Sequence, residues 1–432
     1  MKTLKSNNLS AICLISAMGG FLFGYDWVVI GGAKIFYEPF FSIEASATLR
    51  GWAMSSALVG CLIGAATSGV LSDKYGRKKM LFCSALLFLI SAIGTGAVNH
   101  FDSFIFYRIV GGLAIGIASN VSPIYIAEVS PAEVRGRFVS LNQLTIVLGI
   151  LSAQLINWGI GNSFSDGVHE LSMRSVDLAW RYMFWMEAIP AFLFLILSLF
   201  IPESERWLNS RSEVKEKQEW RVLMSSQVRG VIVIGVVLAV FQQWCGINVV
   251  FNYAQEIFSA AGYNVSDVLF NIVITGVTNV LFTFVAIYTV DKWGRRSLML
   301  IGSMGLTVIY LLIGYCYFVG ITGWVTLILV MMAIACYAMS IAPIVWVVLA
   351  EMFPQKIRGA AMAFSTLFLW IACFVLTYTF PILNDYFKAA GTFWIYAGVC
   401  LLGFVFIRFK LPETKGKSLE ELETYFKKIS DK

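Results

Sequence analysis

Long apolar segments alternate with short polar ones along the whole chain. A helix needs about 20 apolar residues to cross the hydrocarbon layer of a membrane. These segments lack the apolar–polar alternation of membrane-spanning β-strands, so each is predicted to be a helix. Twelve such spans are predicted, at residues 9–31, 52–71, 80–98, 104–127, 138–160, 179–201, 231–251, 269–290, 298–319, 324–350, 360–383 and 392–409. We therefore expect an all-α membrane protein with twelve transmembrane helices.

The composition agrees with this pattern. Of the 432 residues, 58% are hydrophobic and only 13% are charged, whereas soluble domains carry roughly 25% charged residues. These values exclude nucleic-acid-binding proteins, coiled coils and disordered scaffolds. The eight cysteines lie in apolar segments, and neither they nor the two histidines show the spacing of a metal site. We expect no nucleic-acid partner, no metal and no bound cofactor.

The positions of the basic residues predict the orientation. If the N-terminus lies inside, the cytoplasmic segments hold 26 of the 32 Lys and Arg residues and the external loops hold five. Basic residues concentrate on the cytoplasmic side of membrane proteins, so both termini are predicted to be cytoplasmic in a multi-pass cell-membrane protein. The net charge of +6 then reflects orientation and contact with anionic membrane lipids.

Three short motifs in the predicted cytoplasmic segments occur twice, in the same order and at nearly constant spacing. The sequence 73–79 returns as 291–296 after 218 residues, the Glu128/Arg135 pair returns as Glu351/Arg358 after 223, and 202–204 returns as 412–414 after 210. Each motif follows span two, four or six of its half. The repeat predicts two six-helix halves, the arrangement of a transporter whose site lies between them.

This repeat sets the predicted domain boundaries. We expect an N-terminal six-helix bundle at 1–201, a cytoplasmic linker at 202–229, a C-terminal six-helix bundle at 230–410 and a cytoplasmic tail at 411–432. No sizeable soluble domain remains, and a membrane enzyme is not expected, because the aqueous segments carry no arrangement of nucleophile and base.

Charged residues of both signs recur at the predicted cytoplasmic helix ends. They can anchor the helices at the lipid headgroups, or they can form a network that locks the two halves on the cytoplasmic side. Orientation alone does not require acids beside the bases, so we favour the second interpretation, a gate whose rupture accompanies inward opening. The candidate gate residues are Asp73, Arg77, Glu128, Arg135, Asp291, Arg295, Glu351 and Arg358.

Two ionisable residues lie within predicted spans, Asp26 in span one and Arg108 in span four. Placing an unpaired charged side chain in the membrane interior costs several kcal/mol of free energy, so such residues are usually paired and are candidates for functional sites. They can form a permanent structural ion pair. Alternatively, Asp26 is a proton site, because burial disfavours its charged form and a neighbouring Arg favours it. Glu187 in span six is a second candidate for proton coupling, although it can instead pair with Arg181.

The motifs resemble those of the sugar porters of the major facilitator superfamily over nearly the whole chain. The specific signals are Pro-Glu-Ser at 202–204, Gln242-Gln243-x-x-Gly-Ile-Asn248 and Pro-Glu-Thr-Lys-Gly at 412–416. The nearest pattern is that of bacterial sugar–proton symporters such as the xylose symporter, which carry Asp in the span-one motif; mammalian facilitative glucose transporters, which are similar, carry Asn. The resemblance implies the twelve-helix fold, alternating access and a bacterial inner membrane.

Neutral amides and aromatic rings suit a sugar, because they match its hydroxyl groups and its apolar face without burying charge. Any single amide can instead join two helices. The candidates are Gln143, Gln242, Gln243, Asn248, Asn279 and Trp346, and the resemblance adds Phe23 and Trp370 as apolar walls. Ile150 stands where the xylose symporter has a second span-five Gln, and Leu369 precedes Trp370 where relatives usually carry an amide.

These observations predict a secondary active transporter that imports a monosaccharide, a pentose or a hexose, together with a proton. The proton is the only expected coupling ion, and the protein is expected to act as a monomer. A proton-independent uniporter is the first alternative and a non-transporting sugar sensor is the second. The sensor is disfavoured, because such proteins signal through a long cytoplasmic extension and only about 23 residues follow the last predicted span.

Overall fold

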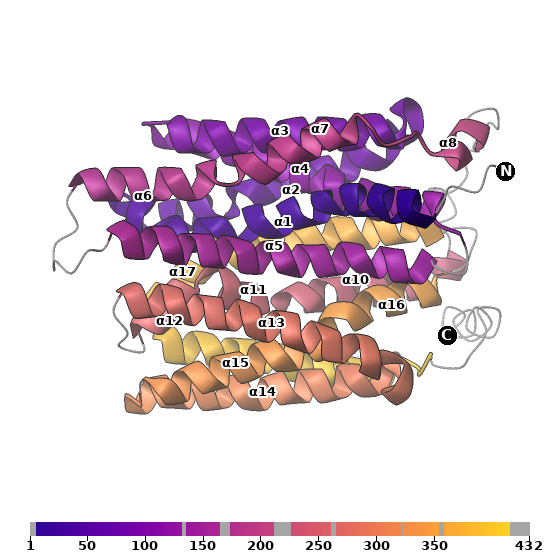
Figure 1. Ribbon diagram of the computed structural model, residues 1–432. Helices are drawn as coiled ribbons and strands as arrows, with labels where there is room; N and C mark the ends of the chain where they lie inside the picture. The colour runs from indigo at the N-terminus through magenta and orange to yellow at the C-terminus, as the bar shows by residue number, and fades with distance from the viewer. Residues whose placement is uncertain are drawn as a thin grey trace. The chain divides into compact units, whose positions relative to one another are not determined.

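The structure is a computed structural model that describes residues 6–131, 135–164, 173–210, 226–260, 265–321, 323–353 and 358–414. Within these ranges the regular elements are all helices (Figure 1). In chain order they are α1 (Ser6–Phe40), α2 (Ala47–Tyr75), α3 (Arg77–Ala97), α4 (Phe101–Val129), α5 (Arg135–Phe164), α6 (Met173–Trp185), α7 (Ala188–Ser198), α8 (Glu205–Ser210), α10 (Ser226–Trp244), α11 (Ile247–Asn252), α12 (Ala254–Ala260), α13 (Val265–Trp293), α14 (Arg295–Val319), α15 (Trp324–Met339), α16 (Ile341–Met352) and α17 (Arg358–Lys410).

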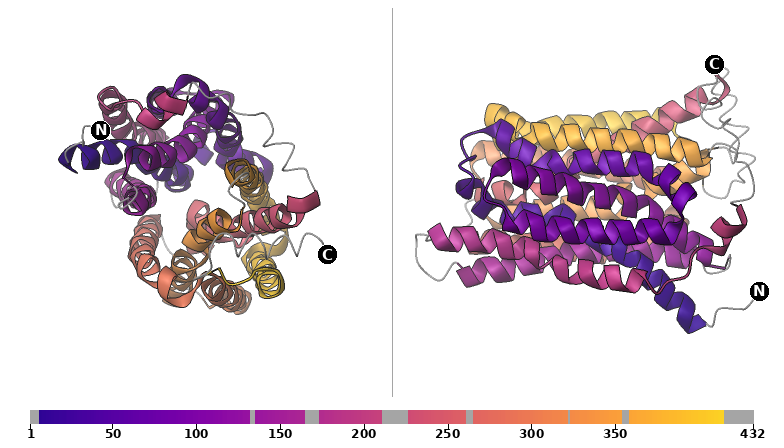
Figure 2. Two further views of the ribbon diagram at one scale, coloured as in Figure 1. Left: turned by 90° about the vertical axis from the view of Figure 1, so that its right-hand side faces the viewer. Right: turned by 90° about the horizontal axis from the view of Figure 1, so that it is seen from above.

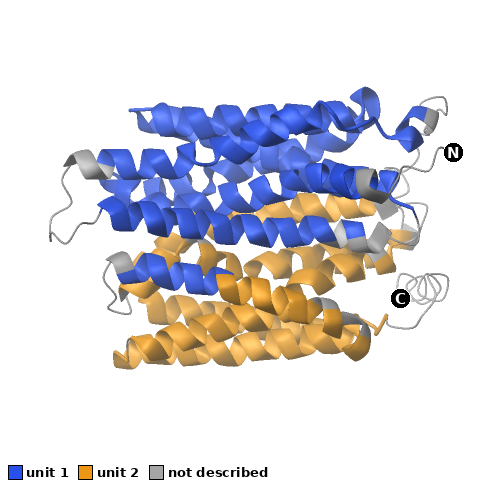
Figure 3. Cartoon of the chain, in the orientation of Figure 1, with its two compact units in different colours: residues 1–214, 264–276 blue, residues 215–263, 277–432 orange. Residues whose placement is uncertain are grey.

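The helices form two compact units (Figure 3). Unit 1 comprises residues 1–214 and 264–276, and unit 2 comprises residues 215–263 and 277–432. The division falls within α13, whose first part belongs to unit 1 and whose remainder belongs to unit 2. Within each unit the helices run alongside one another, as two further views also show (Figure 2).

Eleven helical segments among the described residues are long and apolar enough to cross a membrane. The last of them, Ala361–Lys410, is 50 residues long and contains both of the last two predicted spans. It breaks at Lys388, whose backbone (φ 58°, ψ 177°) is not helical, and this break lies between the two predicted spans. The all-α membrane fold predicted from the hydrophobic pattern is thereby confirmed.

Three spans that hydropathy predicts as continuous helices are interrupted. Span six breaks at Met186–Glu187, span seven at Cys245–Gly246 and span ten at Ser340. Gly246 has a left-handed backbone (φ 86°), which a glycine adopts without steric cost. Each break lies inside a single apolar span, at Asp177–Ser198, Val228–Phe251 and Trp324–Leu349. The predicted spans are therefore present, and the breaks are new information, because hydropathy does not register backbone direction.

Glycines spaced four residues apart, Gly60/Gly64 in α2 and Gly112/Gly116 in α4, bring these two helices into close contact, as such pairs commonly do in membrane proteins. A Cβ atom on Gly60 would lie 2.0 Å from the Ile109 carbonyl oxygen, and one on Gly112 would lie 1.7 Å from that of Ala57. At these positions the backbone of each helix therefore lies directly against the backbone of the other, with no side chain between them. This contact can form only because neither glycine carries a side chain.

Two alanine substitutions in α2 test this packing. Gly60→Ala places a methyl group against the backbone of α4 and is expected to cost about 1–3 kcal/mol through overpacking. Gly69→Ala is the matched control, because nothing lies within 4 Å of the added methyl group and helix propensity favours alanine. We expect the melting temperature of the purified protein to fall by several degrees for Gly60→Ala only. Equal melting temperatures would contradict the proposed packing.

Candidate functional site

A buried ion pair joins α1 and α4 inside unit 1. Arg108 Nη1 donates a hydrogen bond to Asp26 Oδ1, and Arg108 Nη2 lies 3.4 Å from the Asp26 carbonyl oxygen. The Arg108 guanidinium also lies over the Phe184 ring, 5.5 Å from its centroid. Both side chains are at most 1% exposed. The two intramembrane charges singled out by the sequence thus lie in direct contact.

A second carboxyl group belongs to the same cluster. Glu187 lies at the break between α6 and α7, is 1% exposed, and interacts electrostatically with both Asp26 and Arg108. Asp26 Oδ2 and Glu187 Oε1 are buried and accept no hydrogen bond from any described residue. The cluster therefore holds two acids and one base, so its net charge depends on whether one carboxyl group carries a proton.

The alternative pairing of Glu187 with Arg181 is wrong. Arg181 Nε instead lies 2.5 Å from the Asp177 carboxylate, one helical turn earlier. Its Nη1 donates to the carbonyl oxygens of Gly96 and Val98 at the end of α3. Because these groups occupy the Arg181 guanidinium, Glu187 remains with Asp26 and Arg108.

In unit 2 the predicted amides gather around the break between α10 and α11. Gln242 Nε2 donates to the Ala342 carbonyl oxygen at 2.9 Å, which ties α10 to α16. Asn248 Nδ2 donates to Gln243 Oε1 across the break, and it lies 3.7 Å from Cys373 Sγ on α17. The break therefore brings Gln243 and Asn248 together, where a continuous helix would place them one and a half turns apart.

The other predicted sugar-binding residues are distributed over both units. In unit 2, Asn279 is buried on α13, Trp370 is buried on α17, and Trp346 on α16 is 36% exposed. In unit 1, Phe23 on α1 is partly buried and Gln143 on α5 is exposed.

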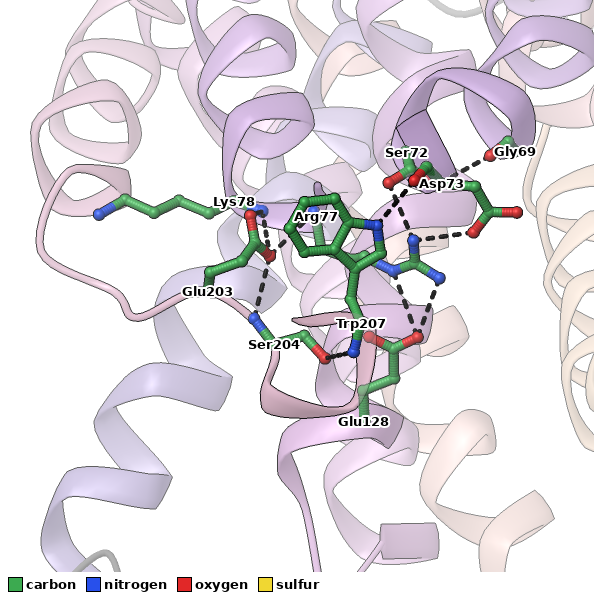
Figure 4. A network of polar contacts seen from close by, with 9 residues as sticks. All are labelled: Gly69, Ser72, Asp73, Arg77, Lys78, Glu128, Glu203, Ser204 and Trp207. Atoms are coloured by element: carbon green, nitrogen blue, oxygen red, sulfur yellow. Dashed lines mark hydrogen bonds and ion pairs between the residues drawn. The ribbon is translucent and has the colours of Figure 1, made fainter. Parts of the chain in front are cut away.

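A network of polar contacts joins the ends of α2, α3, α4 and α8 in unit 1 (Figure 4). Arg77 at the start of α3 binds Glu128 through Nε and Nη2 at 3.2 and 3.0 Å, and Asp73 through Nη1 at 2.8 Å. Its Nη1 also donates to the Ser72 carbonyl oxygen at 2.9 Å. Trp207 Nε1 donates to the Asp73 carbonyl oxygen and fixes α8 against α2. One guanidinium thus connects three helix ends.

Unit 2 repeats this network. Arg295 at the start of α14 binds Glu351 at the end of α16 at 3.1 Å. The Thr414 hydroxyl donates to the other oxygen of Glu351 at 2.6 Å. The side chains of Arg135, Asp291 and Arg358, which the sequence also assigns to the gate, lie outside the described residues. The described gate residues therefore form one ion-pair network in each unit.

Two carboxylates, one from each copy of the repeated Pro-Glu motif at 202–204 and 412–414, complete these networks. Glu203 accepts hydrogen bonds from the backbone N–H groups of Arg77 and Lys78, the first residues of α3. Glu413 accepts the corresponding bonds from Arg295 and Arg296, at the start of α14. A carboxylate suits this position, because helix N-termini carry unpaired N–H groups and a partial positive charge. Glu203 and Glu413 occupy the same place in the two copies of the repeat, 210 residues apart, and this recurrence is the sequence signal that points to them.

A charge-removing substitution tests the role of Glu203. Glu203→Ala leaves two N–H groups of α3 without their acceptor, which is expected to cost about 1–3 kcal/mol. Glu205→Ala is the control, since Glu205 lies two residues away and is exposed. We expect a melting temperature several degrees lower for Glu203→Ala alone, measured by thermal unfolding in detergent. A fall of the same size in both variants would rule out the capping role.

Comparisons with known proteins find relatives of this chain over nearly its whole length. The sugar (and other) transporter family model matches residues 12–220 and 209–426. The chain is 38% identical to the D-xylose-proton symporter of Escherichia coli (strain K12), over 97% of this chain and 96% of the relative. It is 35% identical to the arabinose-proton symporter of Bacillus subtilis (strain 168), over 97% and 96%. It is 34% identical to a glucose transporter of Staphylococcus epidermidis, over 96% and 97%.

Solved structures show the same fold. A crystal structure of a D-xylose-proton symporter superposes with a TM-score of 0.84 at 37% identity, covering 95% of this chain and 99% of that chain. An inward-open structure of the Escherichia coli xylose transporter gives the same TM-score, covering 96% and 99%. The chain therefore belongs to the sugar transporter family and has the membrane fold of the sugar porters of the major facilitator superfamily; it is a transporter, not an enzyme.

Proposed function

We propose that this protein imports a monosaccharide, a pentose or a hexose, together with a proton by alternating access. The observation that carries the proposal is the buried cluster of Asp26, Arg108 and Glu187. Intramembrane carboxyl groups are typical of proton relays in transporters. The relatives named as xylose-proton and arabinose-proton symporters support the same function.

The cluster can hold one proton for electrostatic reasons. With both carboxyl groups ionised, two negative charges face one guanidinium in a site that water does not reach. One added proton makes the cluster neutral, and that state is favoured in a medium of low dielectric constant. Any movement that separates Arg108 from Asp26 favours protonation of the Asp26 carboxylate. When Arg108 moves back to Asp26, release of that proton is favoured. Asp26 and Arg108 are thus assigned proton binding and release, and Glu187 shares the proton.

The driving force is large enough for accumulation. A proton that crosses about 100 mV supplies roughly 2.3 kcal/mol. Since about 1.4 kcal/mol corresponds to a tenfold concentration ratio, this supports about forty-fold accumulation of sugar. A pH gradient adds to this value.

The sugar is bound by neutral amides and aromatic rings. We assign hydrogen bonding to Gln143, Gln242, Gln243, Asn248 and Asn279, and apolar contact to Phe23, Trp346 and Trp370. Discontinuous helices supply binding groups in many transporters. The break beside Gln243 and Asn248 supports this assignment, since it presents both side chains from one point of span seven.

The remaining assignments follow the charge pattern. Both termini are placed in the cytoplasm of a bacterial inner-membrane protein, with helical bundles at 1–201 and 230–410, a linker at 202–229 and a tail at 411–432. The networks around Arg77 and Arg295 are then cytoplasmic and act as gates that stabilise one conformation of the transport cycle. The protein contacts anionic lipids through its basic residues and acts as a monomer.

Uptake into proteoliposomes tests the proposed function directly. Radiolabelled xylose, arabinose and glucose are supplied with and without an imposed proton gradient, interior alkaline. We expect at least one sugar to accumulate above its external concentration only when the gradient is present, and a protonophore to abolish the accumulation. Equilibration at the same rate without a gradient would indicate a uniporter instead.

The variant Asp26→Asn tests the coupling site. The amide keeps the size of the side chain but cannot exchange a proton, so accumulation is expected to fall to the equilibrium level. Counterflow, which needs no net proton movement, is expected to remain. Asp102→Asn is the control, because Asp102 is an exposed acid of the same unit and should leave accumulation unchanged. Normal accumulation by Asp26→Asn would refute the coupling role.

The variant Asn248→Ala tests the sugar contacts. Loss of one hydrogen-bonding group to the substrate is expected to cost about 1–3 kcal/mol, equivalent to a rise in KM of roughly 5- to 140-fold. Asn384→Ala is the control, since Asn384 is likewise an amide but lies on α17, eleven residues beyond Cys373, the α17 neighbour of Asn248. Initial uptake rates over a range of sugar concentrations give both KM values. An unchanged KM for Asn248→Ala would exclude this contact.

A further inference from the structure

Gln154 on α5 is a buried amide that the function described so far does not use. Its side chain is 1% exposed, and neither Oε1 nor Nε2 makes a hydrogen bond with any described residue. Among the described amides that have a buried polar atom without a partner, Gln154 is the one in which both atoms lack one. A buried polar group without a hydrogen-bond partner destabilises the protein. A bound ligand that hydrogen-bonds to the group would remove this cost.

The amide lies against α13 within unit 1. A Cβ atom on Gly276 would lie 1.9 Å from Gln154 Oε1, so the amide occupies space that only a glycine leaves open. The rings of Trp158 and Phe270 join the same two helices, with centroids 5.6 Å apart. Asn271, also on α13, is buried with Nδ2 unpartnered. Both α5 and α13 thus carry a buried amide with unused hydrogen-bonding capacity, and the Gln154 amide lies directly against α13.

The position of Gln154 along α5 suits a substrate contact. It lies near the middle of the apolar segment Leu141–Phe164, and transporter sites lie near the membrane midplane. Eleven residues separate it from Gln143, so the two amides share one face of the helix, about 16 Å apart. Val147 and Ile150, which lie between them on that face, are apolar and buried. This face of α5 therefore presents an amide at each end and apolar side chains between them. Amides can bind the hydroxyl groups of a sugar, and the apolar side chains can contact its ring.

We propose that Gln154 is a further sugar-binding residue, which hydrogen-bonds a hydroxyl group of the monosaccharide near the middle of span five. A hydroxyl both donates and accepts, so it can satisfy Oε1 and Nε2, while a charged ligand would find no counter-charge in the amide. This inference rests on the proposed transport of a monosaccharide. It adds Gln154 to the groups that set affinity and the choice between pentose and hexose.

A neighbouring amide provides the control, because its nitrogen has a protein partner although its Oδ1, like Oε1 of Gln154, accepts no hydrogen bond from any described residue. Asn157 on α5 is also buried, but its Nδ2 donates to the Val29 carbonyl oxygen at 3.0 Å and so joins α5 to α1. Asn157 is therefore a structural amide with a protein partner. Gln154 and Asn157 lie three residues apart on one helix, so the same substitution at each position separates a binding role from a structural one.

The experiment compares Gln154→Leu with Asn157→Leu in the full-length protein. Leu has nearly the volume of Gln and removes both unpartnered atoms, so the melting temperature without sugar should stay equal or rise. For Gln154→Leu we expect KM for xylose, arabinose or glucose to rise about tenfold, with the maximal rate and the proton dependence retained. The ratio of pentose to hexose affinity should change with it. For Asn157→Leu we expect a lower melting temperature and unchanged KM.

Each other result overturns the inference. If Gln154→Leu leaves all three KM values unchanged, the amide does not contact the sugar. If Gln154→Leu unfolds or melts at a lower temperature, the amide is structural, as Asn157 is. Wild-type protein measured in the same vesicles separates these failures from failure of the proposed function, because wild type that transports no sugar contradicts the function itself.

Discussion

The hydrocarbon interior of a membrane offers no hydrogen bonds, and the rest of this structure depends on that constraint. It makes every described span a helix. At the interruption of span seven, the Cys245 thiol donates to the Gln242 carbonyl oxygen and so gives this backbone group a partner. For the same reason Arg108 is stable in the membrane only when it is paired, here with Asp26. Gln154 Oε1 and Nε2, which have no partner among the described residues, are exceptions to this rule.

The duplicated chain has kept one kind of interaction in both copies and divided the others. Each unit contains an arginine bound to a glutamate and a second glutamate on a helix N-terminus, around Arg77 and around Arg295. In contrast, the acid–base cluster of Asp26 lies in unit 1, whereas the residues assigned to the sugar come from both units. Duplication thus preserved the structural motif in both copies, while the residues assigned to the proton belong to one copy.

Much of this arrangement was predictable from the sequence, for identifiable reasons. Asp26 and Arg108 stand out because a charge in an apolar segment is rare, and they do lie in contact. The break at Gly246 was missed because hydropathy reports polarity and not backbone direction. The sequence suggested Glu187 as a partner of Arg181, and Asp177, which is closer along the chain, was not considered; only the fold shows that Asp177 is the partner. Glu203 was noticed, but its capping role requires α3, which lies 126 residues away in sequence, to be placed beside it.

The glutamates that cap α3 and α14 have a further consequence. A helix N-terminus is an attractive site for phosphate, since its free N–H groups and its dipole both favour an anion. Here the chain's own carboxylates already fill these two sites, at 3.0 Å from the Arg77 nitrogen and 2.8 Å from the Arg295 nitrogen. The N-termini of α3 and α14 are therefore already occupied by the carboxylates of Glu203 and Glu413. A sugar phosphate or nucleotide would have to displace a carboxylate that is covalently part of the chain, so we expect it to bind weakly at these two sites.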